Sequence, residues 1–475
     1  MPLDLAHHHL ITPNGMKQSY SNTAQYIVQL QSVELQINQN QLQEAAQQLN
    51  LLAKTASHDP RLFLLGSRLA EAARNPDGML VAARKAHELA PQWPIATIHL
   101  AAVLTSRGEG EEAMTLAALA IQQATSQATQ AGIGTELLIK AATVAQRLNL
   151  HPQALQWLRQ AEQISPDDAS IRYKIGLTLT QGGDPASAIA IFTDLLLQQP
   201  NNPALLSARM QACLSAQESA QAIADGEALL AMDPTNEEYQ FYLDVARGLT
   251  PKTMPVALVL GLVDADAARF DDPVDVQLQH KLPRDVAQMI SQWHPDRKGD
   301  VLDLGCGTGL LGACLGPIEG VLVGVDLSGT MIEQATRRRV YDSFHQVNLL
   351  DALQATPENL YHVITALDVF IYVGCLDAVI PNAYRILLPG GHFVFSCETA
   401  AEGEADYALQ STYRYTHQRS YVERLLQHAG FEDIATESRV LRYEAGQPVA
   451  SFLVTARKAL PKVRKSGPRP KKVAH

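Results

Sequence analysis

The sequence predicts two kinds of fold in one chain of 475 residues: an all-α array of helical hairpins, followed by an α/β domain built on a parallel sheet. Ala, Leu and Gln crowd the first half, a composition typical of packed helices. Pro166, Pro200 and Pro234 recur at intervals of 34 residues (200 − 166 and 234 − 200). From about Pro251 onward short apolar strands alternate with helices, and this alternation predicts a doubly wound sheet.

The charge of the chain is acidic, with 38 Lys and Arg against 49 Asp and Glu and a formal net charge of −11. This balance argues against nucleic acid or an anionic membrane as the main partner. Basic residues gather from Arg457 onward, and we expect residues 459–475 to form a basic, disordered tail. A weak contact of this tail with an acidic partner is the alternative.

Five scattered cysteines without a C-x-x-C pair favour a reducing compartment, and no metal site is predicted. The first residues carry an early acid and no long apolar stretch, unlike a secretory signal. The longest apolar run, Met254 to Val263, is about half of what a bilayer requires. We therefore expect a cytoplasmic protein with no membrane partner.

The segment from Ala169 to Pro200 has the pattern of two antiparallel helices. Gly176 and Ala188 are small residues at the positions where such helices approach each other, and Pro200 ends the second helix. The same register recurs 34 residues before and after this segment, with looser copies further upstream. Because one hairpin cannot bury its apolar face alone, we expect neighbouring hairpins to stack into a solenoid with a concave groove. A plain helical bundle is the alternative.

This pattern resembles the tetratricopeptide repeat, although Arg172 stands where that family usually has an aromatic residue. The resemblance extends over residues 21–248 and implies about five or six hairpins there. It also implies a function, since solenoids of this family bind peptides or protein segments in their groove. We therefore expect a protein or peptide partner, or packing of the repeats on the attached domain.

The second half of the chain alternates strands with helices. Strands are predicted at 301–305, 321–326, 344–350, 362–370 and 392–398, with helices at 329–339, 376–388 and 420–429 between and after them. Two further strands, near 434–443 and 450–457, are expected to form an antiparallel hairpin at the edge of the sheet.

A glycine motif follows the first of these strands, with Gly305, Gly307 and Gly309 at alternating positions. Glycines let the backbone turn sharply and let a ligand approach closely. Asp303 precedes the motif, and a carboxylate there opposes a pyrophosphate but suits a cationic ammonium group. Asp326 ends the next strand, where a carboxylate can accept hydrogen bonds from both hydroxyls of a ribose. The ligand implied is a nucleoside with a positively charged amino-acid tail, S-adenosylmethionine.

The motif resembles that of the class I S-adenosylmethionine-dependent methyltransferases. The resemblance implies a Rossmann-like, seven-stranded domain, which we place at residues 255–458. Asn348 stands where the family commonly has an acid near the adenine amino group, and Asp351 is the fallback for that role. The implied cofactor-binding residues are Asp303, Gly305, Cys306, Gly307, Gly309, Asp326, Leu327, Asn348, Leu349 and Asp368.

Methyl transfer is an in-line displacement that depends on alignment and on the exclusion of water. His417 is the candidate general base, because its ordinary pKa lies near neutrality, while a surface or capping histidine is the alternative. Arg414 is a candidate for holding an acceptor carboxylate, with a structural pairing to Glu423 or Glu444 as the alternative. Tyr372 completes the set of catalytic candidates.

The two halves together resemble the repeat-containing predicted methyltransferases of bacteria. This resemblance implies a methyltransferase that acts on an oxygen of a small or carrier-borne acceptor and uses its repeats for protein docking. Two alternatives stay open: a protein methyltransferase recruited by its repeats, and a non-catalytic module that binds the cofactor only as a structural ligand. The identity of the methyl acceptor is not predicted.

Overall fold

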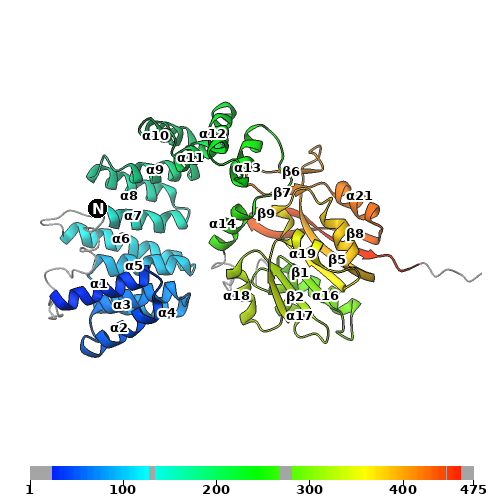
Figure 1. Cartoon of the computed structure of the whole chain (residues 1–475), viewed down its shortest axis with the longest axis horizontal. Coiled ribbons are helices and arrows are strands. Elements are labelled where there is room, and N and C mark those ends of the chain that lie inside the picture. Colours follow the sequence, from blue (N-terminus) through cyan, green and yellow to red (C-terminus); the bar gives the residue numbers. More distant parts are fainter. Residues whose placement is uncertain (1–23, 128–133, 267–280, 445–446, 462–475) are drawn as a thin grey trace, which may run out of the picture. The chain divides into compact units, whose positions relative to one another are not determined.

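A computed structural model of the chain describes residues 24–127, 134–266, 281–444 and 447–461 (Figure 1). The chain divides into two compact units, Met1–Pro234 and Thr235–His475. In the described ranges no helix combines the length and the apolar character needed to cross a membrane.

The first unit is a stack of helices, and its described part forms six successive hairpins (Figure 1). The helices are α1 (Ala24–Asn38), α2 (Leu42–Thr55), α3 (Pro60–Ala72), α4 (Pro76–Leu89), α5 (Pro94–Ser106), α6 (Gly110–Gln127), α7 (Thr135–Arg147), α8 (His151–Ile164), α9 (Ala169–Gln181), α10 (Pro185–Gln198), α11 (Pro203–Ser215) and α12 (Ser219–Met232). Each helix of a hairpin packs on its partner and on the next hairpin. This arrangement confirms the predicted helical array.

Short polar residues start several of these helices. The Asp184 side chain accepts a hydrogen bond from the Ser187 amide at the start of α10, and Pro185 occupies the first helical position. Inside the α9–α10 hairpin, a Cβ at Gly176 would lie 2.6 Å from two ring atoms of Phe192. The small residue predicted from the repeat pattern is therefore required by the aromatic ring that packs on it.

Gly176→Ala is expected to destabilise the first unit by about 1–2 kcal/mol. Overpacking against the Phe192 ring costs about 1–3 kcal/mol, and the better helix propensity of Ala returns up to about 1 kcal/mol. Urea unfolding followed by helical circular dichroism measures the change. Gly66→Ala is the matched control, because a Cβ there meets only the Ala82 Cβ, at 3.9 Å. Equal effects of the two substitutions would contradict the packing argument.

The second unit contains a mixed sheet of nine strands in its described part, in the order β3-β2-β1-β4-β5-β7-β6, with β9 antiparallel to β5 and β8 antiparallel to β9. The strands are β1 (Val301–Leu304), β2 (Leu322–Asp326), β3 (Ser343–Gln346), β4 (Tyr361–Ala366), β5 (Leu387–Thr399), β6 (Tyr407–Leu409), β7 (Tyr415–His417), β8 (Phe431–Glu444) and β9 (Gln447–Lys458). The predicted parallel sheet and the predicted edge hairpin are both present. The two strands beyond the expected seven are the short β6 and β7. Strand β7 pairs in parallel with the last residues of β5, and β6 pairs antiparallel with β7.

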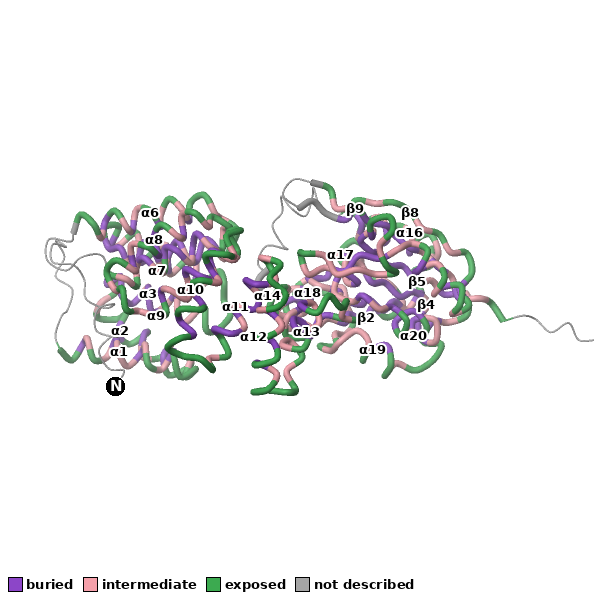
Figure 2. The backbone as a smooth tube through the Cα atoms, turned by 90° about the horizontal axis from the view of Figure 1, so that it is seen from above, coloured by how far each residue is buried: buried purple, intermediate pink, exposed green. Residues whose placement is uncertain are grey.

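Helices cover both faces of this sheet (Figure 2), and its central strands β1, β2 and β4 are accordingly buried along almost their whole length. One core joins the β1, β2, β4 and β5 side chains of one face to α19 (Leu349–Ala355), α20 (Val379–Ile386) and α21 (Arg419–Ala429). The other core joins the opposite face to α16 (Lys281–Trp293) and α17 (Leu310–Leu315). The other helices in the described residues of the unit are α13 (Glu237–Ala246), α14 (Val256–Asp266), α18 (Gly329–Arg337) and the 3₁₀ turn η1 (Phe370–Tyr372).

Helix α13 belongs to the second unit, although it was expected within residues 21–248. Its Phe241 and Tyr242 rings lie 6.3 and 5.6 Å, centroid to centroid, from the ring of Tyr413 in the loop before β7. The predicted domain limits of 248 and 255 stay a prediction. Of the predicted tail, residues 462–475 lie outside the described residues.

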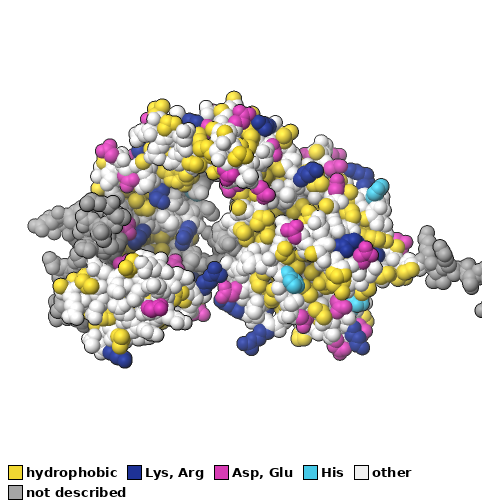
Figure 3. Space-filling model, in the orientation of Figure 1, with side chains coloured by type: hydrophobic (Ala, Val, Ile, Leu, Met, Phe, Trp, Pro, Cys, Tyr) yellow, Lys and Arg dark blue, Asp and Glu magenta, His cyan; other side chains and the backbone are white. Residues whose placement is uncertain are grey.

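Charged side chains of both signs lie interspersed on the face of the molecule that Figure 3 presents. Charge therefore does not mark out a binding surface on that face.

Candidate active site

The glycine motif lies between β1 and α17, at the carboxyl edge of the sheet. Gly305 and Gly307 have φ angles of 65° and 52°, in the left-handed region that favours glycine. A Cβ at Gly305 would collide with the side chain of Val369, whereas a Cβ at Gly307 would meet nothing within 4 Å. Gly305 is thus fixed by its neighbour, and the backbone at Gly307 faces open space that a ligand can fill.

Asp326 at the end of β2 is joined to this loop by its carboxylate. One oxygen accepts a hydrogen bond from the Gly307 amide at 2.9 Å, and the other accepts one from the Ser328 amide at 2.8 Å. The Cys306 amide adds a backbone bond of 3.0 Å to the Val325 carbonyl, and the Cys306 side chain is buried. The structure therefore brings Asp326 and the predicted glycine motif together.

Asp303 is enclosed, with 3% of its surface exposed. Its carboxylate oxygens accept hydrogen bonds from the hydroxyls of Tyr341 and Thr365, each at 2.7 Å. Burial raises the pKa of Asp303 to about 6, while these two hydrogen bonds lower it. In this structure the Asp303 carboxylate is bonded to Tyr341 and Thr365 beneath the glycine motif. Its contact with an ammonium group stays a prediction.

Tyr341 is a residue of the site that the sequence analysis missed. Its hydroxyl donates to Asp303 and accepts a hydrogen bond from the Gly312 amide at 3.2 Å. Its ring fills the space that a Cβ at Gly312 would occupy, and together with the Ala335 Cβ it crowds the position of a Cβ at Gly309. The small residues at 309 and 312 indicate that something approaches closely, but no local pattern identifies Tyr341 as the group that does so.

Tyr341→Phe is expected to destabilise the second unit more at pH 8 than at pH 5. Above the Asp303 pKa of about 6 the buried carboxylate is charged, and the lost hydrogen bond then costs ~1.5–3 kcal/mol, against ~0.5–1.5 for a protonated carboxyl. The raised pKa means that the folded state holds its proton longer than the unfolded state. The stability of the folded state therefore falls as pH rises from about 4 through 6. Loss of the Tyr341 hydrogen bond raises the pKa of Asp303 further, so in the variant the stability continues to fall at higher pH.

Urea unfolding at both pH values measures the difference between wild type and variant. Thr365→Val, which removes the other hydrogen bond to Asp303, should show the same trend. A difference that does not change with pH would show that the Tyr341 hydroxyl does not act through the carboxylate.

The residues predicted to flank an adenine lie on the next strand ends. Leu327 follows β2 and is half-buried, and Leu349 begins α19 and packs on the sheet core. The Asn348 side-chain oxygen caps α19 by accepting a hydrogen bond from the Leu350 amide at 2.8 Å. Asp351 is exposed in the first turn of the same helix.

Asp368 lies just after β4 with a φ of 56°, a strained conformation for a residue other than glycine. Its amide donates to the Ser396 hydroxyl at 2.8 Å, which ties the segment to β5. Val369 then covers Gly305, and η1 brings the half-buried Tyr372 to the end of this segment. Asp368 and Tyr372 thus lie on the segment that closes over the glycine loop.

His417 differs from its prediction. It is fully buried, and its Nε2 lies 3.0 Å from the carbonyl oxygens of both Val373 and Gly374. Because carbonyls only accept, Nε2 carries a proton and donates it. Burial lowers the pKa of His417 to about 4. His417 is therefore neither a surface histidine nor a base at an open site, and its surroundings do not support the predicted role of general base. Arg414 is half-buried in the β6–β7 loop, and its role stays a prediction.

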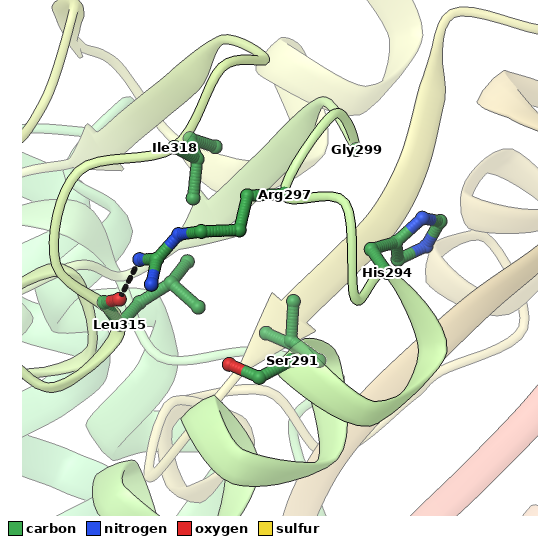
Figure 4. Close-up of a pocket in the computed structure, with 7 residues that line it drawn as sticks. Ser291, His294, Arg297, Gly299, Leu315 and Ile318 are labelled. Atoms are coloured by element: carbon green, nitrogen blue, oxygen red, sulfur yellow. Dashed lines mark hydrogen bonds between the residues drawn. The ribbon is translucent and has the colours of Figure 1, made fainter.

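A small cavity lies at the other edge of the sheet (Figure 4). Its lining includes Ser291, His294 and Gly299, which lies two residues before β1, and Arg297 donates a hydrogen bond to the Leu315 carbonyl. The cavity contains none of the predicted site residues, and the candidate site remains at the carboxyl edge. Across the described ranges, no cluster of three His, Cys, Asp or Glu side chains is arranged to hold a metal ion.

Two segments match known families. Residues 276–436 match the methyltransferase domain, and residues 148–212 match the tetratricopeptide repeat.

Curated proteins that are similar to part of this chain include methyltransferases. The ubiquinone biosynthesis O-methyltransferase of Pseudomonas savastanoi is 27% identical over 130 residues, which cover 26% of this chain and 56% of that protein. The demethylmenaquinone methyltransferase of Symbiobacterium thermophilum is 29% identical over 141 residues, covering 28% and 56%. The chain thus spans about half the length of these relatives.

Among solved structures, the magnesium protoporphyrin IX methyltransferase of Synechocystis with bound S-adenosylhomocysteine is 20% identical with a TM-score of 0.34. The match covers 43% of this chain and 99% of that one.

Proposed function

We propose that this chain, which carries a methyltransferase domain and a tetratricopeptide repeat segment, transfers a methyl group from S-adenosylmethionine to an oxygen of a small or carrier-borne acceptor. The observation that carries the proposal is the Asp326 carboxylate held against the Gly307 amide, beside backbone that faces open space.

The site fits the cofactor by the chemistry of its donors and acceptors. Asp326 would accept hydrogen bonds from the ribose hydroxyls, and the open backbone at Gly307 would lie against the amino-acid tail. Leu327 and Leu349 would flank the adenine, and Asn348 would lie at its polar edge. Asp368 would lie near the methionine part, since it begins the segment that covers Gly305.

When bound, the cofactor supplies an electrophilic methyl group on a positively charged sulfur. The residues of this chain then have to orient the two reactants and exclude water. The segment that contains Val369 and Tyr372 would orient the reactants and exclude water. Arg414 would hold an anionic acceptor. We assign no general base, because an acceptor oxygen that is already ionised requires none.

The oxygen acceptor is supported by relatives whose names identify them as O-methyltransferases of ubiquinone biosynthesis. The repeats support a docking function, in which a bound protein raises the local concentration of the acceptor.

The test uses purified full-length protein, S-adenosylmethionine with a labelled methyl group, and a cell lysate separated into small-molecule and macromolecular fractions. We expect label in the small-molecule fraction or on a carrier. Label on protein side chains would favour a protein methyltransferase, and no label in either fraction would favour a non-catalytic module. An Asp326→Ala variant run in parallel is the control for labelling by other enzymes of the lysate.

A further inference from the structure

The turn Tyr372–Cys375, which begins at the last residue of η1, is paired with a segment that precedes the methyltransferase match. That segment is Pro251–Met254, and an antiparallel bridge joins Thr253 to Val373. The hydrogen bonds run from the Met254 amide to the Tyr372 carbonyl (3.0 Å) and from the Gly374 and Cys375 amides to the Lys252 carbonyl (3.0 and 2.9 Å). One side of the turn is therefore held by backbone from outside the matched domain.

Strand β7 holds the other side of the same turn. His417 donates from Nε2 to the carbonyls of Val373 and Gly374, as described above. Tyr415 donates its hydroxyl to the Pro251 carbonyl at 2.9 Å, and its ring packs where a Cβ of Gly374 would lie, 2.6 Å away. Both side chains are buried, so β7 connects the turn and the Pro251–Met254 segment in one assembly.

The Tyr372–Cys375 turn is also connected to the glycine motif. The Val373 amide bonds the Phe370 carbonyl and the Tyr372 amide bonds the Val369 carbonyl, each at 3.1 Å. The Val369 side chain lies against Gly305 at a distance that leaves no room for a methyl group. Because packed interiors transmit small displacements, a shift of the turn moves the side chain that covers the glycine motif.

We propose that Pro251–Met254 and β7 form a clamp that positions the Tyr372–Cys375 turn over the cofactor site, with His417 and Tyr415 as its positioning residues. The clamp makes residues before the family match part of the functional domain. This inference rests on the proposed function, because it acts through the cofactor site that Gly305 and Val369 form.

The test measures S-adenosylmethionine binding by calorimetry in full-length variants, together with hydrogen exchange of peptides that contain Gly374 and Cys375. His417→Leu removes both hydrogen bonds and should weaken binding about tenfold or more and speed the exchange. His417→Gln offers two amide hydrogens to the same carbonyls and should return binding to within about threefold of wild type. His428→Gln, on the exposed side of α21, is the matched control and should change neither measurement.

The comparison isolates the hydrogen bonds from the imidazole ring, since Gln donates to the carbonyls without the ring. A folded His417→Leu protein with wild-type affinity would overturn the clamp, and so would a His417→Gln protein as weak as His417→Leu. If His417→Leu does not fold, Tyr415→Phe tests the clamp, because it keeps the ring and loses only the bond to Pro251. We expect faster exchange and about threefold weaker binding from it, and wild-type values for both would overturn the proposal.

Failure of the wild type itself to bind S-adenosylmethionine would overturn the proposed function, and with it the role assigned to the clamp. In that case unchanged exchange in the His417 variants would show that the turn is not clamped at all, whereas faster exchange would show that the clamp is purely structural.

Discussion

Asp326→Ala is expected to weaken the binding of S-adenosylmethionine by roughly 2–3 kcal/mol, or about 30- to 150-fold. The carboxylate would lose its charge-assisted hydrogen bonds to the ribose. It would also lose its bonds to the Gly307 and Ser328 amides, which join the end of β2 to the glycine motif and to the start of α18. Calorimetric titration of the full-length protein with S-adenosylmethionine measures the effect.

Two further variants locate the cause of that loss. Asp326→Asn keeps one acceptor oxygen and the shape of the side chain, so its affinity should fall between those of wild type and Asp326→Ala. Glu333→Ala removes an exposed carboxylate from the neighbouring helix α18 and should leave binding unchanged. Unchanged affinity in Asp326→Ala would mean that the ribose does not lie at the end of β2.

The parts of the structure that depend on local spacing could be predicted from the sequence. The 34-residue interval predicts the hairpins because small residues recur where paired helices approach each other, as at Ala154, Ala188 and Ala222. The Gly176 contact with Phe192 shows why a position of this kind stays small. Strand β1, which contains Asp303, and strand β2, which ends in Asp326, could likewise be expected to have their carboxyl ends at one edge of a parallel sheet. Both precede polar or glycine residues at what becomes one edge of the sheet, and β1 and β2 pair in parallel there.

The parts that depend on contacts distant in sequence could not be predicted. Tyr341 reaches Asp303 across 38 residues, and the Tyr415 hydroxyl reaches Pro251 across 164. His417 has the residue type of a general base, and its sequence neighbours do not reveal that two carbonyls from 43 and 44 residues away enclose it. Burial and partner decide the role of an ionisable side chain, and neither is a local property.

The proposed clamp implies that the matched segment alone does not complete the site, and two truncated fragments test this. A fragment of residues 235–475 is expected to bind S-adenosylmethionine within about threefold of the full chain, because it keeps both sheet cores, α13 and the clamp. A fragment of residues 255–475 loses Phe241, Tyr242 and the Pro251–Met254 segment. We expect it to bind at least about tenfold more weakly.

The shorter fragment should also be less stable, because it exposes apolar surface that α13 and Met254 cover and leaves buried amides of the turn without their partner carbonyl. Calorimetry for affinity and urea unfolding for stability, both on purified fragments, distinguish a lost positioning contact from a lost fold. Equal affinity of the two fragments would show that residues 235–254 do not contribute to cofactor binding. A 235–475 fragment that folds and yet does not bind the cofactor would show that the repeats contribute to cofactor binding, and the view of the second unit as self-sufficient would fail.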